Sequence, residues 1–268
     1  MIKYLDIQLN NICNRSCYFC PPQSVNKPKY VEKISENSQN KIITQLEILK
    51  KNNLIIDNPT IGFSRYYEPF TDIELVSSFI KKIRDIFPKA YLMVHTNGDL
   101  ITPEKINKLE NIHIIVSHYS ENLIESLCKT FETFGLNLNI EEKNEEECSY
   151  IIKENKNILI EVYYDKINKY SSSKNFRSRG GLIKEFIGEE RVERCNIAGA
   201  MFGIDVNGAV MPCCDFSTMN PEHLVYSLGN IFTDDILEIV KNAENFNSNL
   251  IERCRFCNAS YLKIIGDK

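Results

Sequence analysis

Residues 1–20 read MIKYLDIQLNNICNRSCYFC, and this stretch decides how the rest of the chain is interpreted. A strand-like run at Tyr4–Leu9 leads into Cys13, Cys17 and Cys20, which have the spacing C-x3-C-x2-C. Three thiolates on one short loop can converge on a single point, and thiolates select iron–sulfur clusters, zinc or copper(I). A structural zinc site needs four ligands, and no fourth candidate lies nearby in the sequence. The loop therefore favours a [4Fe–4S] cluster with one open iron, with a zinc knuckle or buried thiols as the alternatives.

Beyond this loop, strand-like and helix-like segments alternate. The further strand-like runs are Thr60–Ser64, Tyr91–Thr96, Ile112–Ser117, Leu136–Ile140 and Ile158–Tyr164. Helical periodicity is found at Asn40–Lys51, at Asp72–Phe87 with Asp72 as the N-cap, in a turn that starts at Pro103, and at Glu121–Phe134. Six strands alternating with helices predict an α/β fold with a parallel sheet, a partial (β/α)6 TIM-like barrel. A reaction site is expected at the carboxyl ends of its strands.

The pattern changes near residue 170. Two short extended runs, Met201–Val206 and Ala209–Cys213, flank Asn207-Gly208, which is a strong hairpin signal. A helix is expected from Asp234 to about Asn245, and a cysteine pair follows it. We therefore predict two domains, a partial barrel over residues 1–175 and a small hairpin-plus-helix domain over residues 176–268.

The composition is that of an ordinary globular protein, with 43% hydrophobic and 25% charged residues and a formal net charge of −4 over 268 residues. This excludes a disordered chain, and the mild acidity argues against nucleic-acid or anionic-membrane partners. No apolar run approaches the length of a membrane span, and the first residues lack the layout of an export signal. We therefore expect a cytoplasmic protein whose ten cysteines include metal ligands rather than disulfides.

A second cysteine array occupies the C-terminal part of the chain. Its members are Cys195, Cys213, Cys254 and Cys257, with Gly208 four residues short of Cys213. Four thiolates suit a second [4Fe–4S] cluster or one tetrahedral zinc ion, and the spacing alone does not choose between them. Cys214 competes with Cys213 as a ligand but ranks lower by spacing, whereas Cys128 and Cys148 are expected to be plain thiols.

The first array, with Phe19 directly before its third cysteine, resembles the radical S-adenosylmethionine (radical SAM) enzymes. The resemblance implies that the open iron binds the methionine moiety of SAM, with Phe19 against the adenine. It also implies reductive cleavage of SAM to a 5′-deoxyadenosyl radical, which abstracts a hydrogen atom from the substrate. Flavodoxin or a ferredoxin-type protein would then be the electron donor.

Other strand ends carry parts of the same family's motifs. Glu68-Pro69 resembles the end of the family's Gly-Gly-Glu-Pro, but Tyr66 and Tyr67 replace the two glycines that let the backbone approach the SAM amino group. Thr96-Asn97-Gly98 is similar to the Thr-Asn-Gly of relatives with auxiliary clusters, and Ser117-His118-Tyr119-Ser120 places hydroxyls near the ribose. No clear match to the fifth-strand glycine motif is present. The resemblance thus implies a set of SAM-binding residues: Phe19, Glu68, Pro69, Thr96, Asn97, Ser117 and Ser120.

The C-terminal array looks like the "twitch" domain, the short form of the SPASM auxiliary-cluster domain. Together the two arrays imply two [4Fe–4S] clusters, and the compact layout is most similar to the 2-deoxy-scyllo-inosamine dehydrogenases of aminoglycoside biosynthesis. We expect oxidation of a small polyol, sugar or amino-sugar, with the auxiliary cluster accepting an electron. The candidates for the base and for substrate orientation are Tyr66, Tyr67, His95, His118, Arg177 and Arg179, of which the arginines suit orientation better.

Two other functions are compatible with the sequence. One is a radical SAM maturase that modifies a precursor peptide, although a first strand at about residue 4 leaves little room for an N-terminal leader-binding domain. The other is a non-catalytic zinc-binding scaffold whose seven clustered cysteines are structural.

Overall fold

A computed structural model of the chain describes residues 1–17, 20, 31–118, 125–126, 129, 132, 141–142, 149–154, 158–164, 190, 195, 197 and 199–257. Three expectations from the sequence lie wholly or mostly outside these described residues: the strand Leu136–Ile140, most of the helix Glu121–Phe134 and the domain boundary near residue 175.

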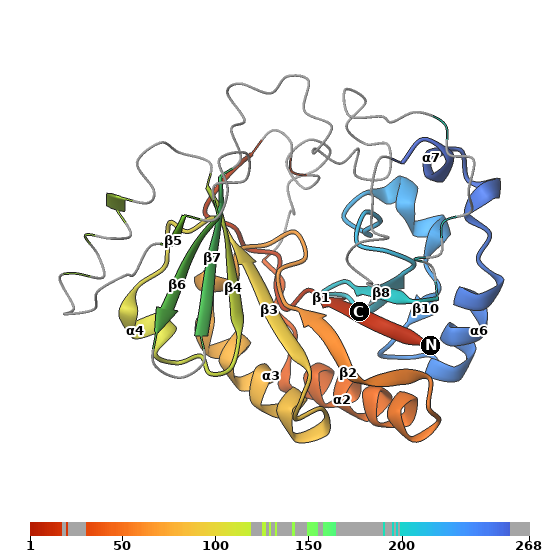
Figure 1. Cartoon of the computed structure of the whole chain (residues 1–268). Coiled ribbons are helices and arrows are strands. Elements are labelled where there is room, and N and C mark those ends of the chain that lie inside the picture. Colours follow the sequence, from red (N-terminus) through yellow and green to blue (C-terminus); the bar gives the residue numbers. More distant parts are fainter. Residues whose placement is uncertain are drawn as a thin grey trace.

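The centre of the molecule is one sheet of ten strands in the order β10-β9-β8-β1-β2-β3-β4-β7-β6-β5 (Figure 1). The strands are β1 (Ile2–Ile7), β2 (Ile55–Gly62), β3 (Tyr91–Thr96), β4 (His113–His118), β5 (Glu141–Glu142), β6 (Ser149–Glu154), β7 (Ile158–Tyr164), β8 (Met201–Ile204), β9 (Ala209–Met211) and β10 (Gly229–Asn230).

Six neighbouring strands of the sheet run parallel, from β8 through β1, β2, β3 and β4 to β7. Antiparallel strands flank them, β9 and β10 on one side and β6 and β5 on the other. The predicted α/β fold with a parallel sheet is therefore confirmed. Within the described residues the two end strands, β10 and β5, are not paired with each other, so the barrel is partial.

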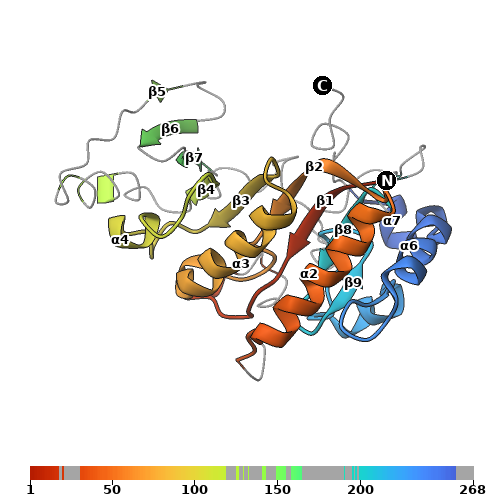
Figure 2. The same ribbon diagram turned by 90° about the horizontal axis from the view of Figure 1, so that it is seen from below.

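Two long helices, α2 (Glu36–Lys51) and α3 (Ile73–Ile86), lie side by side on one face of the sheet (Figure 2). The helical elements are α2 (Glu36–Lys51), η1 (Pro69–Thr71), α3 (Ile73–Ile86), α4 (Pro103–Ile106), η3 (Pro221–Tyr226), α6 (Ile236–Asn245), η4 (Ser248–Leu250) and α7 (Glu252–Arg255), the η elements being 3₁₀ turns. Asp72 caps α3 as predicted, because its carboxylate accepts the N–H of Leu75 at 3.2 Å. In the part of the chain that the structure describes, no helix has the length and apolarity to span a membrane.

The two faces of the sheet differ in chemistry because side chains alternate along each strand. Buried apolar side chains such as Leu5 and Val94 point toward the helices. The Phe63 ring, just beyond β2, packs edge-on against Phe79 of α3 with centroids 6.0 Å apart. The other face carries polar residues such as His95, which is exposed at the carboxyl end of β3. The polar face and the strand ends are thus available to a ligand.

The predicted hairpin forms, but its first strand belongs to the main sheet. β8 pairs in parallel with β1, so that Asp6 lies opposite Gly203. The turn at Asn207-Gly208 uses the positive φ of Gly208 (85°), whose N–H donates to the carbonyl of Asp205 at 2.8 Å. This pairing brings the C-terminal cysteine region beside the strand that leads into the first cysteine loop.

Candidate iron–sulfur and nucleotide site

Hydrogen bonds of the polar residues after β1 fix the position of the first cysteine loop. Asn10 is fully buried, and its side-chain oxygen accepts the N–H of Ile12 at 2.8 Å. The carbonyl of Ile12 in turn accepts the N–H of Glu68 at 2.9 Å. The loop after β1 is therefore fastened to the loop after β2 one residue before Cys13.

The three thiols of this loop lie at the surface of the strand ends. Cys13 is exposed, and Cys17 and Cys20 are half-buried, with the N–H of Cys20 donating to the carbonyl of Cys17 at 3.0 Å. Burial raises the pKa of both Cys13 and Cys17, and the charge of Arg15 opposes that rise at both thiols. At Cys13 the backbone N–H of Arg15 opposes it as well, by donating to the sulfur. A metal bound by these thiols would replace their protons, so its binding would release protons.

Glu68 is a buried acid that accepts three hydrogen bonds in this site. It is 2% exposed, and its carboxylate accepts hydrogen bonds from Thr96 Oγ1 at 2.7 Å, from the N–H of Asn97 at 2.8 Å and from the N–H of Phe70 at 3.0 Å. Burial raises the pKa of Glu68, and these hydrogen bonds hold the rise in check. Glu68 therefore joins the ends of β2 and β3 to each other.

The loop after β3 reaches back to the cysteine loop. The side-chain amide of Asn97 lies 4.0 Å from Cys13 Sγ and donates to Asn14 at 2.9 Å. Arg15 forms an ion pair with Asp99, with Nε at 2.6 Å from a carboxylate oxygen. The predicted residues Thr96 and Asn97 are thus brought together with Cys13 and Glu68, whereas Pro69 is buried in the adjacent 3₁₀ turn.

The two tyrosines that replace glycines have different surroundings. Tyr66 adopts φ of +59°, a left-handed conformation that glycine adopts without strain, and its hydroxyl donates to the carbonyl of Cys214. Tyr67 is 6% exposed; burial raises its pKa well above the ordinary value, against a smaller opposing effect of the Leu9 backbone. Tyr67 is therefore protonated at neutral pH and unsuited to act as a base there.

The other predicted site residues are spread over the strand ends. His95 is exposed and its N–H donates to Ser64 Oγ, while Ser117 is half-buried near the end of β4 and His118 is that strand's last residue. Four predicted residues lie outside the described part of the chain: Phe19, Ser120, Arg177 and Arg179.

The second array gathers around two small apolar clusters. Cys195, Cys213 and Cys257 pack against the cluster of Ile197, Met201 and Cys214. Cys213 and Cys254 pack against a second cluster, formed by three buried residues: Ala209, Met211 and Phe216. Because Cys213 takes part in both, all four predicted ligands share one neighbourhood.

Cys213 itself is half-buried. Burial raises its pKa well above the ordinary value, and the nearby carboxylate of Asp215 raises it further. Asp215 is 2% exposed and lies 3.9 Å from Cys257 Sγ through one of its carboxylate oxygens. None of the described cysteines forms a disulfide.

The donor sets suit iron–sulfur chemistry. Three thiols follow β1 and four surround the hairpin, which are the ligand types that clusters require. Among the described residues, no three His, Cys, Asp or Glu side chains are close enough to share one metal ion. The cysteines of a cubane bind different irons and need not meet at one ion.

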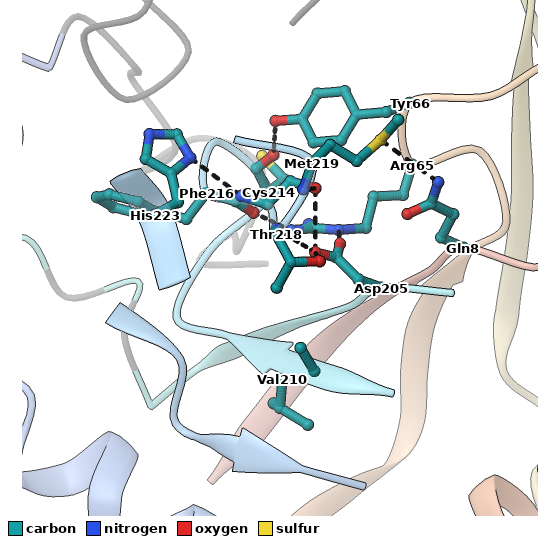
Figure 3. A network of polar contacts seen from close by, with 12 residues as sticks. Gln8, Arg65, Tyr66, Asp205, Val210, Cys214, Phe216, Thr218, Met219 and His223 are labelled. Carbon is teal, nitrogen blue, oxygen red and sulfur yellow. Dashed lines mark hydrogen bonds and ion pairs between the residues drawn. The ribbon is translucent and has the colours of Figure 1, made fainter. Parts of the chain in front are cut away.

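Sequence reasoning missed a buried link between the two arrays. Arg65 forms an ion pair with Asp205, and the side chains are 0% and 1% exposed (Figure 3). Arg65 also donates to the carbonyls of Phe216 and, at 3.4 Å, of Cys213. The sequence offered one unused sign, an arginine directly before the Tyr-Tyr-Glu-Pro segment.

Comparisons with known proteins match part of the chain to a family and to a curated relative. Residues 195–258 match the SPASM family, described as an iron–sulfur cluster-binding domain. A curated relative, the S-adenosyl-L-methionine-dependent 2-deoxy-scyllo-inosamine dehydrogenase of Niallia circulans, is 26% identical over 114 residues, which is 42% of each chain. The alignment thus spans less than half of that relative.

Solved structures share the fold over nearly the whole chain. BtrN in complex with AdoMet and 2-DOIA has a TM-score of 0.67 at 19% identity, covering 100% of this chain and 97% of that one. Native anSMEcpe with bound AdoMet and Cp18Cys peptide has a TM-score of 0.55 at 14% identity, covering 96% and 88%. The predicted resemblance to radical SAM enzymes with a SPASM-type domain is confirmed.

Proposed function

We propose that the chain is a radical SAM oxidoreductase that oxidises a small polyol, sugar or amino-sugar. The observation that carries this proposal is the connected set formed by the three-cysteine loop, Glu68 and Asn97 at neighbouring carboxyl strand ends. The SPASM-type match of residues 195–258 supports a second cluster in the same molecule. It also favours iron over the zinc scaffold that the sequence left open.

In this proposal Cys13, Cys17 and Cys20 hold the SAM-binding [4Fe–4S] cluster, which together with SAM supplies a 5′-deoxyadenosyl radical when bound. The Asn97 amide faces Cys13 and donates toward sulfur, which stabilises the negative charge of a ligated thiolate. Glu68 keeps the β2 and β3 loops in register around that position. Phe19, Pro69, Thr96, Ser117 and Ser120 complete the proposed SAM contacts.

Oxidation of an alcohol removes a hydrogen atom, a proton and one electron. His95 is the best-supported base among the described residues because it is exposed on the polar face of the sheet, near the end of β3. The buried Tyr67 does not suit that role. His118, Arg177 and Arg179 stay in the proposal as groups that orient the substrate or assist proton transfer.

Cys195, Cys213, Cys254 and Cys257 would hold an auxiliary [4Fe–4S] cluster, which would supply an acceptor for the electron left on the substrate. Flavodoxin or a ferredoxin-type protein supplies the electron that starts the next turnover. The same carrier, in its oxidised form, would take the electron back from the auxiliary cluster, so each turnover would consume one SAM and release methionine, 5′-deoxyadenosine, the ketone and a proton.

The test is anaerobic turnover with a panel of aminocyclitols, including 2-deoxy-scyllo-inosamine, beside a cysteine-containing peptide. The proposal predicts one ketone per 5′-deoxyadenosine with at least one aminocyclitol, and deuterium transfer from its carbinol carbon. Turnover of the peptide alone would instead support the maturase alternative. The peptide is included because the chain shares its fold with anSMEcpe, whose structure contains a bound peptide.

A further inference from the structure

The backbone of Arg65 belongs to the proposed SAM site, whereas its guanidinium lies beside the C-terminal cysteine array. Arg65 lies three residues before Glu68, in the loop that follows β2. Its guanidinium donates to the carbonyls of Cys213 and Phe216 in the loop after β9. It also pairs with Asp205, which directly follows β8 (Figure 3). The Arg65 side chain therefore joins the two proposed cofactor regions.

Asp205 holds the far end of this link in place. Its second carboxylate oxygen accepts hydrogen bonds from Ser217 Oγ at 3.0 Å, from the N–H of Thr218 at 2.5 Å and from Thr218 Oγ1 at 2.8 Å. The loop that follows Cys213 is thus wrapped around the same carboxylate that binds Arg65.

The pair is costly to bury and is satisfied throughout. Burial alone would lower the pKa of Arg65, but the carboxylates of Asp205 and Asp6 raise it above its ordinary value, so the guanidinium is charged. Gly203 makes room for it, because a Cβ there would collide with the guanidinium. A buried pair of this kind adds little net stability over apolar residues, so its stability alone is a weak reason for its presence.

We propose that Arg65 is a positioning residue that sets the electrostatic environment of the auxiliary cluster and its placement relative to the SAM site. This inference rests on the proposed function, because it assumes that Cys213 ligates that cluster. Donors aimed at a ligand residue, and a positive charge nearby, stabilise the more negative, reduced form of a cluster. Tyr66 supports the same loop, since its hydroxyl donates to the carbonyl of Cys214.

Two substitutions perturb the guanidinium in different ways. Arg65→Lys keeps the charge but loses the fork that reaches Asp205 and two carbonyls at once. Gly203→Ala keeps Arg65 but displaces its guanidinium, because the added Cβ would collide with it. Arg84→Lys is the matched control, because Arg84 also donates to backbone carbonyls, those of Pro88, Ala90 and Asn111, at the opposite strand ends.

The experiment uses the full chain, reconstituted anaerobically, with iron and sulfide counted for each variant. Potentiometric titration followed by electron paramagnetic resonance gives the midpoint potential of each cluster, and 5′-deoxyadenosine released under dithionite gives SAM cleavage. The comparison is made between variants that retain the iron content of the wild type.

We expect Arg65→Lys and Gly203→Ala to lower the midpoint potential of the auxiliary cluster. We also expect them to weaken the magnetic interaction between the two reduced clusters. Arg84→Lys should leave both unchanged. The inference would be overturned if both Arg65→Lys and Gly203→Ala kept the wild-type midpoint potential of the auxiliary cluster and the wild-type magnetic interaction between the clusters. A wild-type chain that holds iron but never cleaves SAM would overturn the proposed function instead, so the two failures are distinguishable.

Discussion

The carboxylate of Glu68 accepts the backbone N–H of Asn97 at 2.8 Å, and this hydrogen bond ties the loop after β2 to the loop after β3. The side chain of the same asparagine reaches Cys13 Sγ at 4.0 Å. One buried acid is thus connected through one amide to the first cysteine loop. We therefore expect the proposed SAM site to respond to changes at residues that are not themselves proposed metal ligands.

Glu68→Gln should destabilise the chain and impair SAM cleavage. A glutamine amide has one acceptor oxygen for three donors, and its NH2 group would oppose an N–H or a hydroxyl. We expect a loss of roughly 1–3 kcal/mol in the free energy of unfolding, measured by denaturant titration. Glu47→Gln on the exposed side of α2 is the control. Equal effects of the two substitutions would contradict the role given to Glu68.

Asn97→Asp should weaken the first cluster without disturbing the second. It replaces an amide donor beside Cys13 with a negative charge, which opposes a thiolate-bound cluster. We expect SAM cleavage to fall roughly 10- to 100-fold, the usual range for a group that supports a metal ligand. The measurement is 5′-deoxyadenosine production per iron, with Asn58→Asp, at an exposed position within β2, as the control. Full cleavage activity in Asn97→Asp would count against this placement.

Tyr67→Phe should change the response to alkali. The folded pKa of Tyr67 is raised, so above its ordinary pKa of about 10 the unfolded chain loses this proton before the folded chain does. The Tyr67 contribution to stability is therefore constant below about pH 10 and falls as the pH rises further. Denaturant titrations across that range should show the wild type losing stability relative to Tyr67→Phe. A constant difference between the two proteins would show that the phenol titrates normally.

Cys213→Ser and Cys214→Ser distinguish two adjacent thiols. Cys213 contacts both apolar clusters that gather the other three cysteines, whereas Cys214 is a buried member of one of them. We expect Cys213→Ser to lose about half of the roughly eight irons and Cys214→Ser to keep them. The reverse pattern in iron and sulfide analysis would assign the ligand to Cys214.

Local patterns in the sequence were enough to predict much of the fold. Asp72 before an apolar stripe predicted the start of α3, and Asn207-Gly208 predicted the β8–β9 turn, because capping and turn geometry depend on neighbouring residues. The sequence did not show that β8 would pair with β1. That contact depends on the packing of distant segments, on which local periodicity gives no information.

In the site, too, short motifs could be predicted from the sequence and long-range contacts could not. The cysteine spacings and Glu68-Pro69 were readable because each is a short motif, and the structure brings Cys13, Glu68 and Asn97 together. The partners of Arg65 were not readable, since Asp205 lies 140 residues away in the chain. Tyr66 was noted as a departure from glycine, yet it keeps a glycine-like φ. A residue name alone does not show such strain.

The central claim is that the loop of Cys13, Cys17 and Cys20 holds a cluster that cleaves SAM. The most direct measurement is 5′-deoxyadenosine formed by anaerobically reconstituted protein with SAM and dithionite. We predict formation in the wild type and in Cys128→Ala, and none in Cys13→Ala, Cys17→Ala or Cys20→Ala. Wild-type protein that carries its full iron and sulfide yet releases no 5′-deoxyadenosine would contradict the account.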